Sequence, residues 1–323
     1  MPTPTPMPTP TPMPIPTIPV VLGHAACTGG SLIYRILTST FGFSSLSEVG
    51  VARVSSQQHY SPWDPELQLF ARNDISAKEF GDIIFDRILA CQKIATKKQQ
   101  RVLVREHTHS FYFNPTAPEI LPTGGSWFTD LYREKFGDLV PGIVSVRDPI
   151  DSWLGFRRTF ATQLPDQFDE YCRVYNRYLD KIDAQNNERK QFLIFKYEDF
   201  LTEPQRHLDM IADHIGQPRK EADLSSVGKL FGSGNSGRVS NDLQKRDRRP
   251  FSHRLYKEAE NSHEYSRLCD RLNYPLVFED VSTYDRIRAY TFTCIAKCSW
   301  VFKFAESFAR RYNGSFLTGK NIQ

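Results

Sequence analysis

From residue 18 onward, short apolar runs alternate with stretches of helical period. The runs expected to form strands are 18–22 (IPVVL), 101–106 (RVLVRE), 142–148 (GIVSVRD) and 191–199 (QFLIFKYED). Three stretches expected to form helices cover about 30–41, 77–98 and 165–186. Two further helices are expected to begin at Pro149 and near Glu203. Short apolar runs between helices are typical of a parallel sheet with both faces covered. The pattern predicts an α/β fold, a parallel β-sheet flanked by helices, with its ligand site at the carboxyl ends of the strands.

The two ends of the chain depart from this pattern. Residues 1–19 have proline at nearly every second position, which removes donors and fixes φ. This favours an extended spacer over a docking ligand for an aromatic groove. We therefore expect a proline-rich tail over 1–17, a main domain over 18–280, and a C-terminal amphipathic helical extension over 281–323.

Within that extension, residues 284–312 place apolar side chains near one helical face and basic residues off it. We favour packing of this face against the protein's own core or against a second subunit. The second kind of packing would make a homodimer. Weak contact with a membrane surface is the alternative.

Composition limits the class of protein. The chain has 323 residues, of which 40% are hydrophobic, enough for a sizeable core. Its formal charge of +4 suits anionic ligands but is too small and dispersed to indicate nucleic-acid binding. No apolar run approaches the length of about 20 residues that a transmembrane helix needs. No secretion signal is recognisable at the N-terminus, so a cytoplasmic location is expected.

The six cysteines are scattered without CxxC pairs. In a chain of this length they are expected to be reduced thiols, and their spacing does not indicate a zinc site or any other metal site.

A small-residue segment, GHAACTGGSLIYRIL, begins at Gly23 directly after the first expected strand. Gly29 and Gly30 let backbone N–H groups converge on an anion, and the following helix adds its dipole. Thr28 and Ser31 can donate hydroxyls. A Walker A loop needs GxxxxGK[ST], and no lysine occurs from Gly23 to Leu37, so an ATPase or kinase of that kind is not expected. The alternative interpretation is a tight turn between strand and helix.

Two later segments also suit phosphate. VSVRDPIDSW puts Arg147 at a strand end, Asp148 and Pro149 at the start of a helix, and Ser152 one turn along. SGNSGRVSND carries Arg238 in a Gly/Ser loop that can close over a nucleotide. Each segment alone is typical of a capped helix or a solvated loop, but three in this order are more specific.

Four segments together, HAACTGGSLIYRIL, VRDPIDSW, FKYEDFLTEP and SGNSGR…RRP, resemble the signature segments of sulfotransferases that use 3′-phosphoadenosine 5′-phosphosulfate (PAPS). The resemblance covers about residues 18–275 and implies a P-loop NTPase-like sulfotransferase fold with PAPS as co-substrate. It implies that Arg147 binds the 3′-phosphate, that Arg238 contacts the nucleotide from the other side, and that the 5′-phosphosulfate lies on the first loop. The loop residues concerned are Cys27, Thr28, Gly29, Gly30, Ser31 and Leu32.

The chain departs from the family at two positions. Cys27 stands where the family has a loop lysine that steadies the leaving oxygen, and His24, Arg105 and His107 are candidates to replace that charge. Gly155 falls where many members have a serine for the 3′-phosphate, a loss that Ser152 can cover.

Sulfuryl transfer to a hydroxyl requires a base, and histidine suits that role near neutral pH. LVREHTHS supplies two histidines just past a strand end. Members of the family tend to have Thr-His or Ser-His here, so the resemblance favours His109 as the base. It also puts His107 where members often have a basic residue that helps the leaving phosphate. In the alternative, one histidine is structural and the other solvated. Glu198 and Asp199 are expected to cap the next helix and to support the site.

The acceptor is expected to be a hydroxyl of a carbohydrate, a lipid or a small molecule. The aromatic segments 42–76 and 110–130 are expected to be loop-like and to form its walls. A second hypothesis, motivated by Cys27, is a nucleotide-binding module or scaffold that no longer transfers sulfate.

Overall fold

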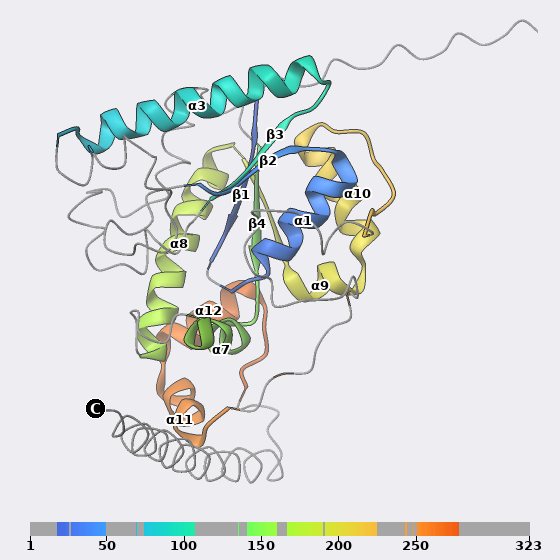
Figure 1. Ribbon diagram of the computed structural model, residues 1–323. Coiled ribbons are helices and arrows are strands. Elements are labelled where there is room, and N and C mark those ends of the chain that lie inside the picture. The colour runs from blue at the N-terminus through green and yellow to red at the C-terminus, as the bar shows by residue number, and fades with distance from the viewer. Residues whose placement is uncertain are drawn as a thin grey trace, which may run out of the picture. The chain divides into compact units, whose positions relative to one another are not determined.

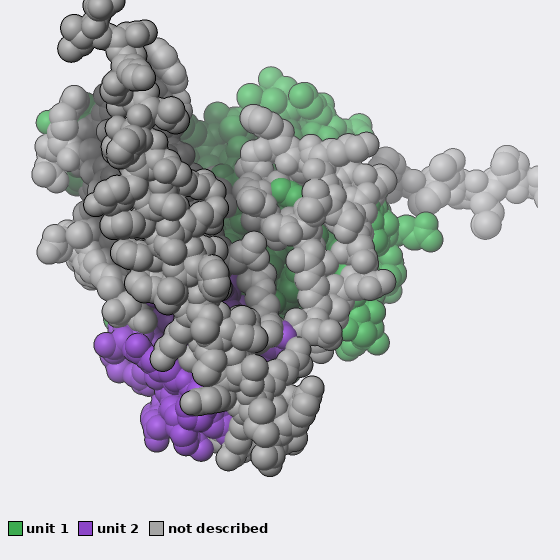
Figure 2. All heavy atoms as spheres, turned by 60° about the horizontal axis from the view of Figure 1, so that its bottom comes forward, with its two compact units in different colours: residues 1–147, 177–245 green, residues 148–176, 246–323 purple. Residues whose placement is uncertain are grey.

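The computed structural model describes residues 18–25, 27–49, 69, 74–106, 135, 141–159, 167–189, 191–224, 243, 248 and 251–277. The chain divides into two compact units, which Figure 2 distinguishes by colour. Unit 1 comprises Met1–Arg147 and Arg177–Lys245, and unit 2 comprises Asp148–Asn176 and Arg246–Gln323. The proline-rich tail and the C-terminal extension lie outside the described residues, so the predicted division into three regions stays a prediction.

Unit 1 contains a parallel sheet. Its described residues form five strands in the order β2-β3-β1-β4-β5, and every neighbouring pair is parallel. The strands are β1 (Val20–His24), β2 (Ser44–Val49), β3 (Val102–Glu106), β4 (Gly142–Val146) and β5 (Phe192–Lys196). Each of the four predicted apolar runs overlaps one of these strands, which confirms the predicted α/β class.

Strand β2 corrects one prediction, because residues 42–76 were expected to be loop-like. Ser44–Val49 instead forms an outer strand of the sheet and pairs with β3, beginning where the Ser44 N–H donates to the Arg101 carbonyl at 3.0 Å. The sequence SSLSEV has only two apolar residues. Backbone pairing at the outer position needs little apolar surface, so the hydrophobic pattern did not reveal this strand.

Helices cover both faces of the sheet, with α1, α9 and α10 on one face and α3 with the unit 1 part of α8 on the other (Figure 1). Their bounds are α1 (Gly30–Phe41), α3 (Ala77–Lys97), α8 (Phe168–Arg189), α9 (Tyr197–Thr202) and α10 (Pro204–Ile215). The predicted helices that fall within the described residues are confirmed. Glu198 and Asp199, however, do not cap the next helix. They lie in the first turn of α9, and the N-cap of α10 is Glu203.

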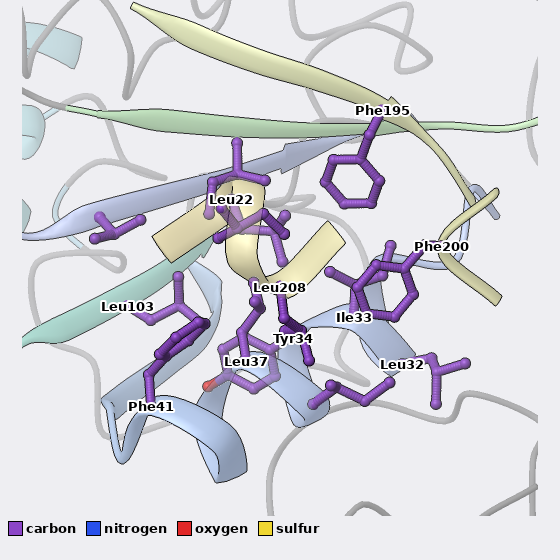
Figure 3. Close-up of a cluster of buried hydrophobic side chains, with 14 of the residues drawn as sticks. Leu22, Leu32, Ile33, Tyr34, Leu37, Phe41, Leu103, Phe195, Phe200 and Leu208 are labelled. Carbon is purple, nitrogen blue, oxygen red and sulfur yellow. The ribbon is translucent and has the colours of Figure 1, made fainter. Parts of the chain in front are cut away.

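The core of unit 1 fixes α1 against the sheet. Figure 3 shows Leu32, Ile33 and Leu37 on the face of α1 that packs toward the strands and toward α9 and α10. Each of these three side chains is at most 2% exposed. Burying a leucine or isoleucine of this kind contributes about 1.5–3 kcal/mol, so the start of α1 and the loop before it are held firmly.

Unit 2 is helical and its core is aromatic. It contains α7 (Pro149–Thr159), the first part of α8, α11 (His253–Asn261) and α12 (His263–Leu272). The Trp153 ring lies 5.3 Å from Tyr171 and 5.9 Å from both Phe156 and Phe168. Cys172 and Cys269 are buried beside this cluster, and burial raises the pKa of each thiol. None of the four described cysteines forms a disulfide.

Candidate functional site

The loop between β1 and α1 is tightened by its own hydrogen bonds. The Thr28 hydroxyl donates to the Ala25 carbonyl at 2.8 Å, and the Thr28 N–H reaches the same oxygen at 3.3 Å. Cys27 takes a left-handed conformation with φ of 63°, which is uncommon for a residue other than glycine. Thr28 is fully buried, so its side chain braces the loop from within.

Two aromatic rings lie directly against the loop glycines. A Cβ atom at Gly29 would collide with the Tyr197 ring, and one at Gly30 would collide with the His24 imidazole. Gly29 also has φ of +88°, a conformation that glycine adopts without strain. Both glycines are therefore required by close packing, and this packing brings the His24 ring to the start of α1.

The first turn of α1 has the character of an anion-binding helix end. Its N-cap is Gly29, which has no side chain to cap the helix. The first turn of α1, all of which is described, contains no acidic residue. Unsatisfied N–H groups and the positive end of the dipole therefore meet at the loop. Leu32 contributes differently, because its N–H donates to the Gly29 carbonyl at 2.9 Å and its side chain lies in the core.

Arg147 follows β4 directly and reaches the loop. Its Nη1 donates to the Cys27 carbonyl at 3.2 Å, and its guanidinium carbon lies 5.2 Å from the centre of the Tyr197 ring. Its Nε is 3.8 Å from Glu198 Oε1, so the two side chains form an ion pair. Two segments far apart in the sequence, the loop and the R-D-P segment, are thus joined at the carboxyl end of the sheet.

Arg105 lies on the other side of the same loop. Its Nη1 donates to Ser31 Oγ at 2.7 Å, and its Nε and Nη2 donate to Ser47 Oγ at 3.0 and 2.8 Å. The residue is 2% exposed, and burial lowers its pKa to about 10, which leaves it charged at neutral pH. Two of the three candidates for the missing loop cation, Arg105 and His24, therefore lie beside the loop.

Ser152 belongs to unit 2 and lies in the first turns of α7. Its Oγ is buried and has no hydrogen-bond partner among the described residues. Asp148 accepts a hydrogen bond from the Asp151 N–H at 3.0 Å and pairs with Arg248, whose Nε is 3.6 Å from Asp151 Oδ1. Sequence analysis assigned no role to Arg248 itself, although the segment SGNSGR…RRP that contains it was among those that resemble the family's signatures.

Several predicted site residues lie outside the described residues, namely His107, His109 and Arg238. The same holds for segments 110–130 and 284–312, so their assignments stay predictions. Among the described side chains, no group of three or more His, Cys, Asp or Glu residues could hold a metal ion. No described helix is both long enough and apolar enough to cross a membrane.

Comparisons with known proteins give only distant similarity. No family model matches the chain, and no curated protein matches it. Among solved structures, the chain is similar to a sulfotransferase from Alicyclobacillus acidocaldarius, with 13% identity, coverage of 80% of this chain and 97% of that one, and a TM-score of 0.43. It is also similar to the mouse sulfotransferase SULT7A1 complexed with PAP, with 12% identity, coverage of 79% and 90%, and a TM-score of 0.41.

Proposed function

We propose that this protein transfers a sulfuryl group from PAPS to a hydroxyl of an acceptor, which is a carbohydrate, a lipid or a small molecule. The observation that carries the proposal is the hydrogen bond from Arg147 to the Cys27 carbonyl. It joins the two segments that resemble the phosphate-binding signatures of sulfotransferases. A backbone loop at a helix N-terminus beside a guanidinium is a favourable environment for a phosphate or sulfate group.

In this proposal different residues bind the two ends of the co-substrate. The loop N–H groups and Ser31 bind the 5′-phosphosulfate, and Arg147 with Arg238 binds the 3′-phosphate. The buried Ser152 hydroxyl suits the 3′-phosphate as well, because a buried hydroxyl without a partner costs free energy that a ligand oxygen would recover. PAPS supplies the sulfuryl group and a phosphate leaving group when it is bound.

His109 accepts the proton of the acceptor hydroxyl, and His107 donates a hydrogen bond to the leaving phosphate oxygen. Histidine suits the first role because its pKa lies close to the working pH. The proposal includes a cytoplasmic enzyme, since described cysteines without disulfides suit a reducing compartment.

Calorimetric titration of the full chain with adenosine 3′,5′-bisphosphate tests the nucleotide part of the proposal, and saturable binding is expected. Absence of binding overturns the assignment. A screen with ³⁵S-labelled PAPS against sugars, lipids and phenols then tests transfer. His109→Ala is expected to abolish labelling and keep bisphosphate binding, whereas His253→Ala in α11 changes neither.

A nucleotide-binding module without transferase activity is the second candidate, and Cys27 favours it. A cysteine at this position cannot supply the charge of the family's loop lysine. A module would bind the bisphosphate, label no acceptor, and stay inert after Cys27→Lys. In the enzyme, Cys27→Lys is expected to change an existing rate, since a new cation is placed beside the leaving oxygen.

A further inference from the structure

Arg105 lies in a buried polar cluster behind the first turn of α1. Its guanidinium contacts hydroxyls from two elements, Ser31 at the start of α1 and Ser47 on β2. Its guanidinium carbon is also 5.5 Å from the centre of the Tyr34 ring. The cluster therefore connects the end of β3 to α1 and β2 through side chains.

The direction of the bond to Ser31 follows from the chemistry of arginine. A guanidinium has donors only, so Ser31 Oγ must be the acceptor in this bond. The hydroxyl proton of Ser31 is then available for donation in another direction. Ser31 is partly exposed whereas Arg105 is buried, so Ser31 connects the buried charge to the loop surface.

We propose that Arg105 acts through Ser31 on the anion held by the loop and supplies the positive charge that a loop lysine would otherwise give. This inference rests on the proposed function, because it concerns the 5′-phosphate end of the same site. Arg105 is a positioning residue, since one hydroxyl separates it from the ligand. A buried charge that is one hydroxyl away from a phosphate keeps a sizeable attraction for it, because water screens the pair only in part.

Arg101 provides a matched control, because it directly precedes β3 whereas Arg105 lies near the end of the same strand. It is 3% exposed, and burial lowers its pKa to about 10, as for Arg105. Its hydrogen bonds go instead to the backbone carbonyls of Ile18 and Ile215, at the opposite end of the strand. Loss of Arg101 should therefore affect stability and leave the loop unchanged.

The experiment compares two ligands that differ at the loop. Adenosine 3′,5′-bisphosphate has a 5′-phosphate and adenosine 3′-monophosphate does not, so the ratio of their dissociation constants reports what the loop contributes. Arg105→Gln keeps a donor for Ser31 and removes the charge, whereas Arg105→Lys keeps the charge. Calorimetry on the full-length wild type and on both variants gives the ratios, with Arg101→Gln as the stability control.

We expect Arg105→Gln to weaken bisphosphate binding about thirtyfold, equivalent to about 2 kcal/mol, and to change monophosphate binding by less than about threefold. Arg105→Lys should recover most of the loss, and Arg101→Gln should leave both affinities unchanged. If Arg105→Gln does not fold, Ser47→Ala replaces it, with an expected loss of about threefold for the bisphosphate alone. An equal loss for both ligands, or no loss for the bisphosphate, overturns the inference.

Failure of the proposed function gives a different result. A wild type that binds neither nucleotide refutes the PAPS assignment, and the role of Arg105 is then tested with inorganic pyrophosphate. A rise in melting temperature with pyrophosphate that Arg105→Gln abolishes and Arg105→Lys retains supports the inference. No rise in the wild type, or the same rise in Arg105→Gln, overturns it.

Discussion

The two ends of the parallel sheet in unit 1 use their buried and half-buried cationic and imidazole groups differently. At the amino ends of the strands, Arg101 donates to the carbonyls of Ile18 and Ile215. In the same region His214 Nε2 donates to the carbonyl of Gly142 at 2.9 Å. These bonds tie the beginnings of β1, β3 and β4 to the end of α10.

At the carboxyl ends the corresponding groups surround the loop. Arg105 donates to Ser31 and Ser47, and Arg147 donates to the Cys27 carbonyl beside Glu198. At the amino ends these side chains therefore hold backbone segments together. At the carboxyl ends they are arranged around the loop between β1 and α1. Substitutions at the amino end should change stability alone, and those at the carboxyl end should change ligand affinity.

The largest effect on stability is expected from Arg101→Gln. Its loss removes a charged donor from two backbone carbonyls, at a cost of about 3 kcal/mol in the free energy of unfolding. Urea denaturation measures the change, and bisphosphate affinity should stay that of the wild type. A variant with normal stability would show that the amino end is not held in this way.

Arg147→Ala should affect the other end of the sheet. We expect bisphosphate binding to weaken by about 2–4 kcal/mol, because a charge-assisted pair with the ligand is lost. Arg173→Ala, which removes only the exposed pairs with Asp169 and Glu170, is the control and should leave affinity unchanged. Calorimetry decides, and equal affinities of the two variants would contradict the assignment of Arg147.

The two ends of α1 allow a sharper comparison, because Gly29 and Gly42 both have positive φ, of 88° and 70°. Among the described residues, no atom lies within 4 Å of a Cβ built at Gly42, whereas one at Gly29 meets Tyr197. Gly42→Ala should cost about 1 kcal/mol of stability from backbone strain alone, and Gly29→Ala about 2–3 kcal/mol. Thermal and urea denaturation of the two variants test this. Equal losses of stability would show that the Tyr197 ring moves aside at no cost in free energy.

The smallest effect is expected from His214→Leu. It removes the hydrogen bonds from Nε2 to the carbonyls of Gly142 and Gln191, at 2.9 and 3.2 Å, near the surface of the amino end. The expected loss is about 1 kcal/mol of unfolding free energy, with no change in bisphosphate affinity. A measurable loss of bisphosphate affinity would show that the amino ends of the strands also affect ligand binding.

The sequence predicted the sheet well because four strands are apolar on both faces. Runs such as VVL before Gly23 and IVSV before Arg147 can be buried only inside a covered parallel sheet. Strand β2 was missed for the opposite reason, since Ser44, Ser45 and Ser47 carry no apolar signal. Its existence depends on backbone pairing with β3, which the residue pattern of one segment does not reveal.

The candidate site was predicted in part. The loop and Arg147 could be found because local spacing places both at strand ends, and the structure brings them together. Arg105 was recognised only as one of three possible cations, because its partners Ser31 and Ser47 are separated from it by 74 and 58 residues. Nothing local in VLVRE distinguishes an arginine that reaches a loop from one that reaches solvent.

The central place of β1 has a consequence for the synthesis of the protein. β1 lies between β3 and β4, so neither of its edges can be paired until residues 102–106 and then 142–146 have been made. At about 5–20 residues per second, the interval between His24 and Val146 lasts about 6–24 s on the ribosome. During that time at least one edge of an apolar strand is unpaired, which makes the nascent chain a substrate for chaperones and a risk for aggregation. The same arrangement makes sheet assembly depend on distant contacts, so refolding from denaturant should be slow compared with that of a helical protein of equal size.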